Sequence, residues 1–446
     1  MYLPTRLQRG LAEYLRVFRL FSPNVRSVMV YAVFEGLVFG VFQLIFNFYV
    51  LSLGGYDNSF IGNLVSASSF ASLLVAVPAA FVAGKFPARS ILIVSGIVSA
   101  LSLFGVVVLP YRAALIALNI LSGLAVSFRQ VALFPFLMSN TGEGERQYVF
   151  SFQFGLGLVA QFAGNMLGGS LPLWLGGLIL VEATSAAAYQ MAIGSMSFVA
   201  LAAVIPLLFI QRNVAKGQET PPLPWRKLPK YAGQIAKLLA SPFAIGLGAG
   251  LMVPFMNIYF RNVYNKSDAT IGLVVGVSVL GMGIAQFIAP PMAKSIGKIN
   301  TVMLTQGLSI PFLILLGVGG YIVPAGLGSR EIWFAVAAFA FFMRLSLMNL
   351  SGPVYQTFIL ERVEREAMAL TTSLFGMSFT IGWFISPSIS GWLQDTYAPF
   401  GFVPVFTITS ITYVVGTFLL WLFFRNAEKA VPPDVGTSDG ALAGAK

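Results

Sequence analysis

The sequence lacks two residue types and is poor in charge. None of its 446 residues is cysteine or histidine, and only 10% are charged. Without cysteine there are no disulfides or thiolate ligands, and without histidine the usual proton shuttle at neutral pH is missing. Proton transfer would therefore have to use carboxylates. No Ser/His/Asp set, metal cluster or phosphate loop can be assembled, so we expect neither an enzyme nor a cofactor.

Long apolar runs, by contrast, are abundant. Hydrophobic residues make up 57% of the chain, and runs of membrane-spanning length recur from Val28 to Phe424. A bilayer core about 30 Å thick needs roughly 20 apolar residues per helical crossing. We predict an all-α membrane protein of about twelve spans, at residues 28–53, 59–83, 90–109, 114–138, 148–169, 188–210, 242–263, 269–293, 301–323, 332–357, 367–391 and 402–424. We expect 171–187, whose apolar part is shorter than a span, to form an interfacial excursion.

Lysine and arginine predict the orientation. With a cytoplasmic N-terminus, most of the 27 basic residues fall in cytoplasmic segments. The exceptions are Arg112, Arg261, Lys266 and Arg330 on the other side and Arg129 and Arg344 inside spans. Such an excess is typical of cytoplasmic loops. We expect a multi-pass protein of the cytoplasmic membrane with both termini in the cytoplasm, and the basic net charge needs no nucleic-acid partner.

A proline-rich, basic segment divides the chain. Residues 220–224 read TPPLP, typical of a linker, and a basic amphipathic stretch follows. The predicted organisation is an N-terminal amphipathic segment (1–27), a six-helix bundle (28–210), a linker with an amphipathic helix (211–241), a second six-helix bundle (242–425) and a flexible tail (426–446).

The two halves resemble each other. A gapless alignment pairs Asn47 and Tyr49 with Asn257 and Tyr259. Six plus six spans in matching order predict parallel repeats related by an axis along the membrane normal, with the substrate between the halves near the midplane.

Three short segments follow a known pattern. Residues 83–89 read AGKFPAR, 293–298 read AKSIGK, and 164–169 read GNMLGG. The first two are similar to the cytoplasmic signature of the major facilitator superfamily: small residue, acid, base, any residue, glycine, base, base. The third is similar to the Gly-Pro-x-x-Gly-Gly element of that family's antiporters. The resemblance marks Gly84, Lys85, Arg89, Lys294, Gly297 and Lys298 as gating residues and Gly164, Asn165, Gly168 and Gly169 as an antiporter-like element.

The resemblance extends over nearly the whole chain. It implies two six-helix bundles related by a pseudo-twofold axis, a central cavity bordered by spans one and four, and alternating access. Gly84 and Lys294 stand where the signature has an acid, so we do not expect its charge relay here. Asn165 stands where the antiporters have proline.

Three ionisable residues lie at membrane depth: Glu35, Arg129 and Arg344. Each costs at least about 2.5 kcal/mol on insertion scales and should face a cavity or a partner. Glu35 and Arg129 fall at similar depth, and we predict an ion pair that proton or substrate binding breaks, with Glu35 as the proton-coupling residue. Arg344 has no embedded acid in its half, so it either binds an anionic substrate or braces backbone carbonyls.

Other side chains could contact a substrate. Phe39, Phe42, Phe46 and Tyr49 share the helical face of Glu35 and predict an aromatic cavity wall. The remaining polar candidates are Asn47, Asn119, Gln130, Asn257 and Tyr259. The repeated Asn/Tyr pairs are better explained as organisers of helix ends, because most amides within spans serve helix packing.

These features predict a monomeric secondary transporter in the lipid bilayer. The first hypothesis is proton-coupled export of a small organic or amphipathic molecule. The alternatives are uptake of an organic anion through Arg129 and Arg344, and a lipid flippase whose arginines bind a phosphate headgroup.

Overall fold

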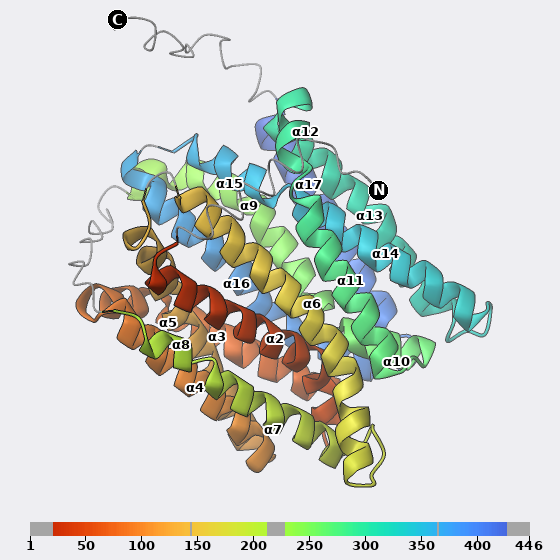
Figure 1. The fold of residues 1–446 in the computed structure, drawn as a ribbon. Coiled ribbons are helices and arrows are strands. Elements are labelled where there is room, and N and C mark those ends of the chain that lie inside the picture. Colours follow the sequence, from red (N-terminus) through yellow and green to blue (C-terminus); the bar gives the residue numbers. More distant parts are fainter. Residues whose placement is uncertain (1–20, 143–144, 212–227, 364, 426–446) are drawn as a thin grey trace, which may run out of the picture.

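The computed structural model describes residues 21–142, 145–211, 228–363 and 365–425, in which every regular element is a helix (Figure 1). The first half contains α2 (Pro23–Ser52), α3 (Asn58–Lys85), α4 (Ala88–Val108), α5 (Arg112–Ser139), α6 (Arg146–Leu178), α7 (Ala186–Ala202) and α8 (Ile205–Leu208). The second contains α9 (Leu228–Met252), η2 (Val253–Phe255), α10 (Met256–Tyr264), α11 (Asp268–Ala285), α12 (Ala289–Ile296), α13 (Lys298–Ile322), α14 (Arg330–Leu350), α15 (Gly352–Leu360), α16 (Arg365–Thr396) and α17 (Phe402–Phe424).

The predicted membrane-spanning fold is confirmed. In the described residues, 10 segments are long and apolar enough to cross a membrane. Two further helices, α6 with 33 residues and α16 with 32, are longer than a crossing requires but less apolar. Both pack against the opposite half, α6 on α11 and α16 on α3, so part of their surface meets protein instead of lipid. Together these helices account for the predicted spans.

The predicted interfacial excursion at 171–187 is wrong. Helix α6 continues through these apolar residues to Leu178, and only 179–185 form a link. The next helix starts where the Ser185 side chain accepts a hydrogen bond from the backbone N–H of Ala188, an N-cap. The apolar run is too short to span by itself, but as an extension of span five it needs no separate crossing.

The amphipathic stretch before the second half is part of a membrane helix. Helix α9 begins at Leu228 and runs without interruption past the predicted boundary at 241. Its buried face carries Tyr231 and Ile235, which belong to the predicted amphipathic stretch, and Leu238 one turn further on. The predictions for 1–20, for 212–227 and for the tail at 426–446 lie outside the described residues.

The internal repeat is visible in matched hydrogen bonds. The Tyr49 hydroxyl donates to the carbonyl of Val106 at 3.1 Å, and the Tyr259 hydroxyl donates to that of Leu316 at 2.6 Å. In both bonds the acceptor lies 57 residues after the tyrosine. Equivalent tyrosines thus tie the first span of each half to the third.

Glycine lets helices of opposite halves touch at the backbone. A Cβ atom on Gly391 of α16 would lie 2.1 Å from the carbonyl oxygen of Asn58 at the start of α3. A Cβ on Gly169 of α6 would lie 2.5 Å from the carbonyl oxygen of Asp268 at the start of α11. Small residues at such contacts allow the close approach that drives helix association in lipid.

Helix packing within the first half gives a test of these contacts. A Cβ on Gly164 would lie 2.3 Å from the carbonyl oxygen of Leu37 on α2, whereas a Cβ on Gly155 of the same helix meets nothing within 4 Å. We expect Gly164→Ala to destabilise the protein by about 1–3 kcal/mol, because the backbones must separate. Thermal unfolding of the purified protein measures this, with Gly155→Ala as the matched control. Equal stability of the two variants would contradict the packing described.

Candidate functional site

The halves enclose a cavity of about 350 Å³, here called the central cavity. Gln43 and Leu44 of α2 and Gln161 and Asn165 of α6 line it from the first half, and helices from α9 to α17 line it from the second. Much of its wall is apolar. This apolar surface includes Met256, Met282, Phe341, Met348, Phe375, Phe379 and Trp383. An apolar wall with a few polar groups is typical of small-molecule sites.

Arg344 alone is charged among the described residues that line the central cavity. Its side chain is 2% exposed and takes part in none of the ion pairs of the described chain. One terminal nitrogen donates to the Tyr413 hydroxyl, and Nε donates to no acceptor. Removing a guanidinium from water without a counter-charge costs several kcal/mol. The burial of Arg344 therefore lowers the stability of the folded protein.

Amide side chains complete the polar part of the cavity wall. The Gln161 side chain donates to Oε1 of Gln43 at 3.0 Å. Buried Oδ1 of Asn165 and Oε1 of Gln306 accept no hydrogen bond. The central cavity therefore presents a cation and two unused acceptors.

A second, smaller cavity of about 110 Å³ lies within the first half, between α2, α4, α5 and α7. We call it the N-half cavity. Glu35 and Arg129 line it and form the predicted ion pair, with their side chains 29% and 12% exposed. Tyr31 also hydrogen-bonds to Arg129. The pairing prediction is confirmed, and the proton-coupling role stays a prediction.

The predicted aromatic wall is only half correct. Phe39, 52% exposed, and Phe42 line the N-half cavity. Phe46 and Tyr49 are buried in the hydrophobic core, which contains residues of both halves, and they line neither cavity. Among the polar candidates, Asn119 lines the N-half cavity and donates to the carbonyl of Leu115 in its own helix. Gln130 is exposed and lines neither described cavity, and Tyr259 is a core residue.

Asn47 and Asn257 meet between the halves. Asn47 donates to Oδ1 of Asn257 at 2.9 Å and to the carbonyl of Pro254 at 2.7 Å, and Asn257 donates to the carbonyl of Leu44 at 2.7 Å. These residues occupy equivalent positions of the repeat, so they lie on the pseudo-twofold axis. Asn257 also lines the central cavity, whereas Asn47 does not. Their main contribution is to join the halves.

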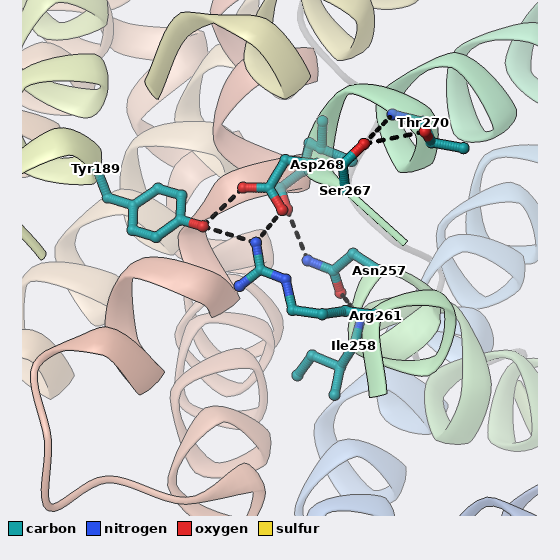
Figure 2. Close-up of polar contacts among 8 residues, drawn as sticks. Tyr189, Asn257, Ile258, Arg261, Ser267, Asp268 and Thr270 are labelled. Atoms are coloured by element: carbon teal, nitrogen blue, oxygen red, sulfur yellow. Dashed lines mark hydrogen bonds and ion pairs between the residues drawn. The ribbon is translucent and has the colours of Figure 1, made fainter. Parts of the chain in front are cut away.

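Two polar clusters join the halves on one side of the bundle. We call this the distal side; it is where α2 ends and α3 begins. In the first cluster Tyr189 of α7 donates to Asp268 at 2.6 Å, and Arg261 donates to the Tyr189 hydroxyl at 2.6 Å and pairs with Asp268 (Figure 2). The Arg261 guanidinium also lies 3.2 Å from the ring centre of Phe48 on α2, a cation–π contact.

The second cluster caps a helix across the seam. Asp395, near the end of α16, accepts hydrogen bonds from the backbone N–H groups of Asn58 and Ser59 at 3.2 and 2.7 Å and from both of their side chains. A carboxylate at a helix N-terminus is stabilised by unpaired N–H groups and by the helix dipole. We call these two clusters and the asparagine pair the distal seal.

The residues marked by the family resemblance lie mainly at helix ends and contacts. Gly84 and Lys85 end α3, Arg89 donates to the Leu208 carbonyl at 2.6 Å, Lys294 is exposed, and Lys298 pairs with Glu361. Gly297 has a φ of +90°, which favours glycine. In the antiporter-like element, Gly164 and Gly168 pack on α2, Gly169 packs on α11, and Asn165 lines the central cavity.

Sequence reasoning missed the two polar clusters of the distal seal and much of the central cavity. Asp268 and Asp395 lie at the ends of spans, where acids are common, so nothing in the sequence marked them. Gln43, Gln306 and Tyr413 lie within spans like many packing residues. Their shared role depends on contacts between segments far apart in the chain.

The Glu35–Arg129 pair predicts an energetic coupling. Replacing Glu35 by glutamine leaves a shielded guanidinium without its partner, and we expect a loss of about 1–3 kcal/mol. The Glu35→Gln/Arg129→Gln double variant should be more stable than the two single losses together predict. Thermal unfolding of the four proteins measures the coupling. Additive losses would show that the pair contributes no net interaction.

Comparisons with known proteins agree with this architecture. A family model described as Major Facilitator Superfamily matches residues 238–443. A mutant of the nucleoside transporter NupG is similar over 90% of this chain and 99% of its own, with 15% identity and a TM-score of 0.72. A bacterial homologue of the human lysosomal transporter Spinster, inward-facing and unoccupied, shares 12% identity over 92% of this chain and 98% of its own, with a TM-score of 0.71.

A D-xylose–proton symporter has 13% identity over 90% of this chain and 98% of its own, with a TM-score of 0.69. A search of curated protein sequences finds no match. These likenesses show the fold, and the family model matches the second half of the chain. The second half of the chain therefore matches the Major Facilitator Superfamily model, and the chain as a whole shares its fold with membrane transporters.

Proposed function

We propose that this protein moves a small organic or amphipathic molecule across the cytoplasmic membrane by alternating access, coupled to protons and in the direction of export. The observation that carries the proposal is a cavity lined by both halves, together with polar contacts that join the halves on the distal side. Alternating access requires such a cavity, with contacts between the halves that break when it opens to the other side.

The basic residues give the sidedness of this proposal. If both termini lie in the cytoplasm, as the proposal has it, the distal side would face outward, and this arrangement of the halves would be a state closed to the outside. A cytoplasmic solute would enter the central cavity in this state. Release outside would then require the Asp395 and Arg261 contacts to break, which is the order of events in export.

Helix α2 offers a route from a proton site to the cavity and the seal. Glu35 lines the N-half cavity, Gln43 lines the central cavity, and Asn47 belongs to the distal seal. Protonation of Glu35 would remove the charge that Arg129 pairs with. A shift of α2 would then act on the cavity and the seal together, because one helix carries all three residues.

Structural neighbours support a small organic solute. They include proteins named as a nucleoside transporter and as a D-xylose–proton symporter. The volume of the central cavity lies within the range of about 300–1,000 Å³ for small-molecule sites.

Proton coupling predicts a substrate-dependent pH change. In vesicles that contain the purified protein and a pH-sensitive dye, nucleosides, pentoses and aromatic acids are added one at a time. We expect at least one solute to move protons with the unmodified protein. Glu35→Gln should abolish this movement but retain exchange of labelled against unlabelled solute, because exchange needs no net proton transfer. The direction of proton movement relative to the added solute distinguishes antiport, which the export proposal requires, from symport.

Glu331→Gln is the matched control, since this carboxylate is 75% exposed and pairs with Lys266 away from both cavities. Proton movement that persists in Glu35→Gln would exclude Glu35 as the acceptor. Loss of all folded protein in that variant would show that the pair is structural. Movement of labelled phospholipid without a gradient would favour a flippase.

If the distal seal closes the central cavity to the outside, weakening the seal should make the cavity more accessible from outside. Because the chain has no cysteine, Met348→Cys places a single thiol in the wall of the central cavity. An impermeant thiol reagent added outside intact cells should label it slowly. Adding Asp395→Asn should raise the rate about tenfold, the factor that corresponds to about 1.4 kcal/mol of lost seal energy.

Asp57→Asn is the control for this experiment. Asp57 accepts a hydrogen bond from the Phe60 backbone N–H within α3, so it caps the same helix without joining the halves. Equal labelling rates in the Asp57 and Asp395 variants would contradict a role of Asp395 in the seal.

A further inference from the structure

The charges of the two halves are balanced differently. In the first half Arg129 of α5 pairs with Glu35. In the second half Arg344 of α14, the equivalent helix, faces only the Tyr413 hydroxyl and has an unused Nε. Both arginines lie in cavity walls. The first half thus carries its own counter-charge, whereas the counter-charge of Arg344 is missing from the described cavity wall.

Two hydrogen-bond acceptors in the wall of the same cavity have no donor in the described chain. Asn165 on α6 and Gln306 on α13 line the same cavity, one from each half, and each has a buried carbonyl oxygen without a donor. A buried acceptor without a partner is as unfavourable as a lost hydrogen bond. A ligand with N–H or O–H groups would satisfy both, and its contacts would reach across the two halves.

The remaining wall accepts a flat apolar group. Phe375, Phe379 and Trp383 follow one another along α16, and Phe341 lies one helical turn before Arg344 on α14. Aromatic faces pack well on a ring, and a cation at the edge of such a surface fixes the orientation of an attached acid.

We infer that the solute of the central cavity is a small organic anion with an aromatic or similarly flat body and at least one hydrogen-bond donor, held by Arg344 through its acidic group. This inference rests on the proposed function, because it identifies the solute class of the same cavity. An aromatic amino or hydroxy carboxylate has all three features. The inference does not depend on the direction of transport or on Glu35.

Thermal unfolding of the full chain in detergent tests the inference with 4-aminobenzoate, 4-hydroxybenzoate and indole-3-acetate, each compared with its neutral primary amide. A ligand that binds the folded state raises the unfolding temperature. We expect at least one acid at millimolar concentration to raise it more than its amide does. Arg344→Gln should weaken acid binding about 30-fold or more, because the acid loses its charged partner.

Arg330→Gln is the matched control, since Arg330 is exposed at the start of the same helix and lines no described cavity. It should bind the acids as the unmodified protein does. Arg344→Lys keeps the charge and serves where the glutamine variant does not fold. We expect weaker acid binding with the preference for acid over amide retained, because lysine lacks the planar donor fork.

Equal effects of acids and amides, no acid effect at all, or full acid binding in either Arg344 variant would overturn the inference. Failure of the proposed function would look different. Vesicles would then move no solute although the acids bind through Arg344. Conversely, transport of neutral solutes alone would support the transporter and refute the anion.

Discussion

Polar groups inside a helical bundle that faces lipid have no bulk water to bind, so each needs a partner in the protein or a cavity. This constraint explains where the charged residues of the described chain lie. Glu35 and Arg129 neutralise each other within the first half. Arg261 and Asp268 do so between the halves, with Tyr189 completing the cluster. Arg344 has no acidic partner and lies against the central cavity.

The two halves share matched hydrogen bonds but differ in the charges that line their cavities. Tyr49 and Tyr259 make the same hydrogen bond in each half, and Asn47 and Asn257 bond to each other on the axis. The cavity walls are not symmetric, because among the described residues Arg129 has a carboxylate beside it, whereas Arg344 has none. In the proposed mechanism, the symmetric scaffold would let the halves move as similar rigid bodies, and the asymmetric charges would give each half a different task.

The distal seal consists of a small number of hydrogen bonds to charged groups. Asp395 binds four donors at one helix end, and Arg261 binds a carboxylate, a hydroxyl and an aromatic face. Each hydrogen bond to a charged group contributes about 1.5–3 kcal/mol to stability. This is far less than the burial of an entire hydrophobic core contributes. A seal of a few such contacts can hold one state and still release it, whereas the bundles stay folded through their apolar cores.

The sequence by itself determined the number and order of the spans, the division into two halves, the repeat and the depth of Glu35, Arg129 and Arg344, because each follows from local apolar length or from spacing along one helix. Tertiary structure decided which residues share a wall. Phe46 and Tyr49 lie on the same face as Phe39 but are covered by neighbouring helices, while Asp395 reaches the start of α3 from the far end of the chain. The spacing of residues along one helix shows which of them share a face. It does not show which helix covers that face, because contacts between distant spans depend on how the whole bundles pack.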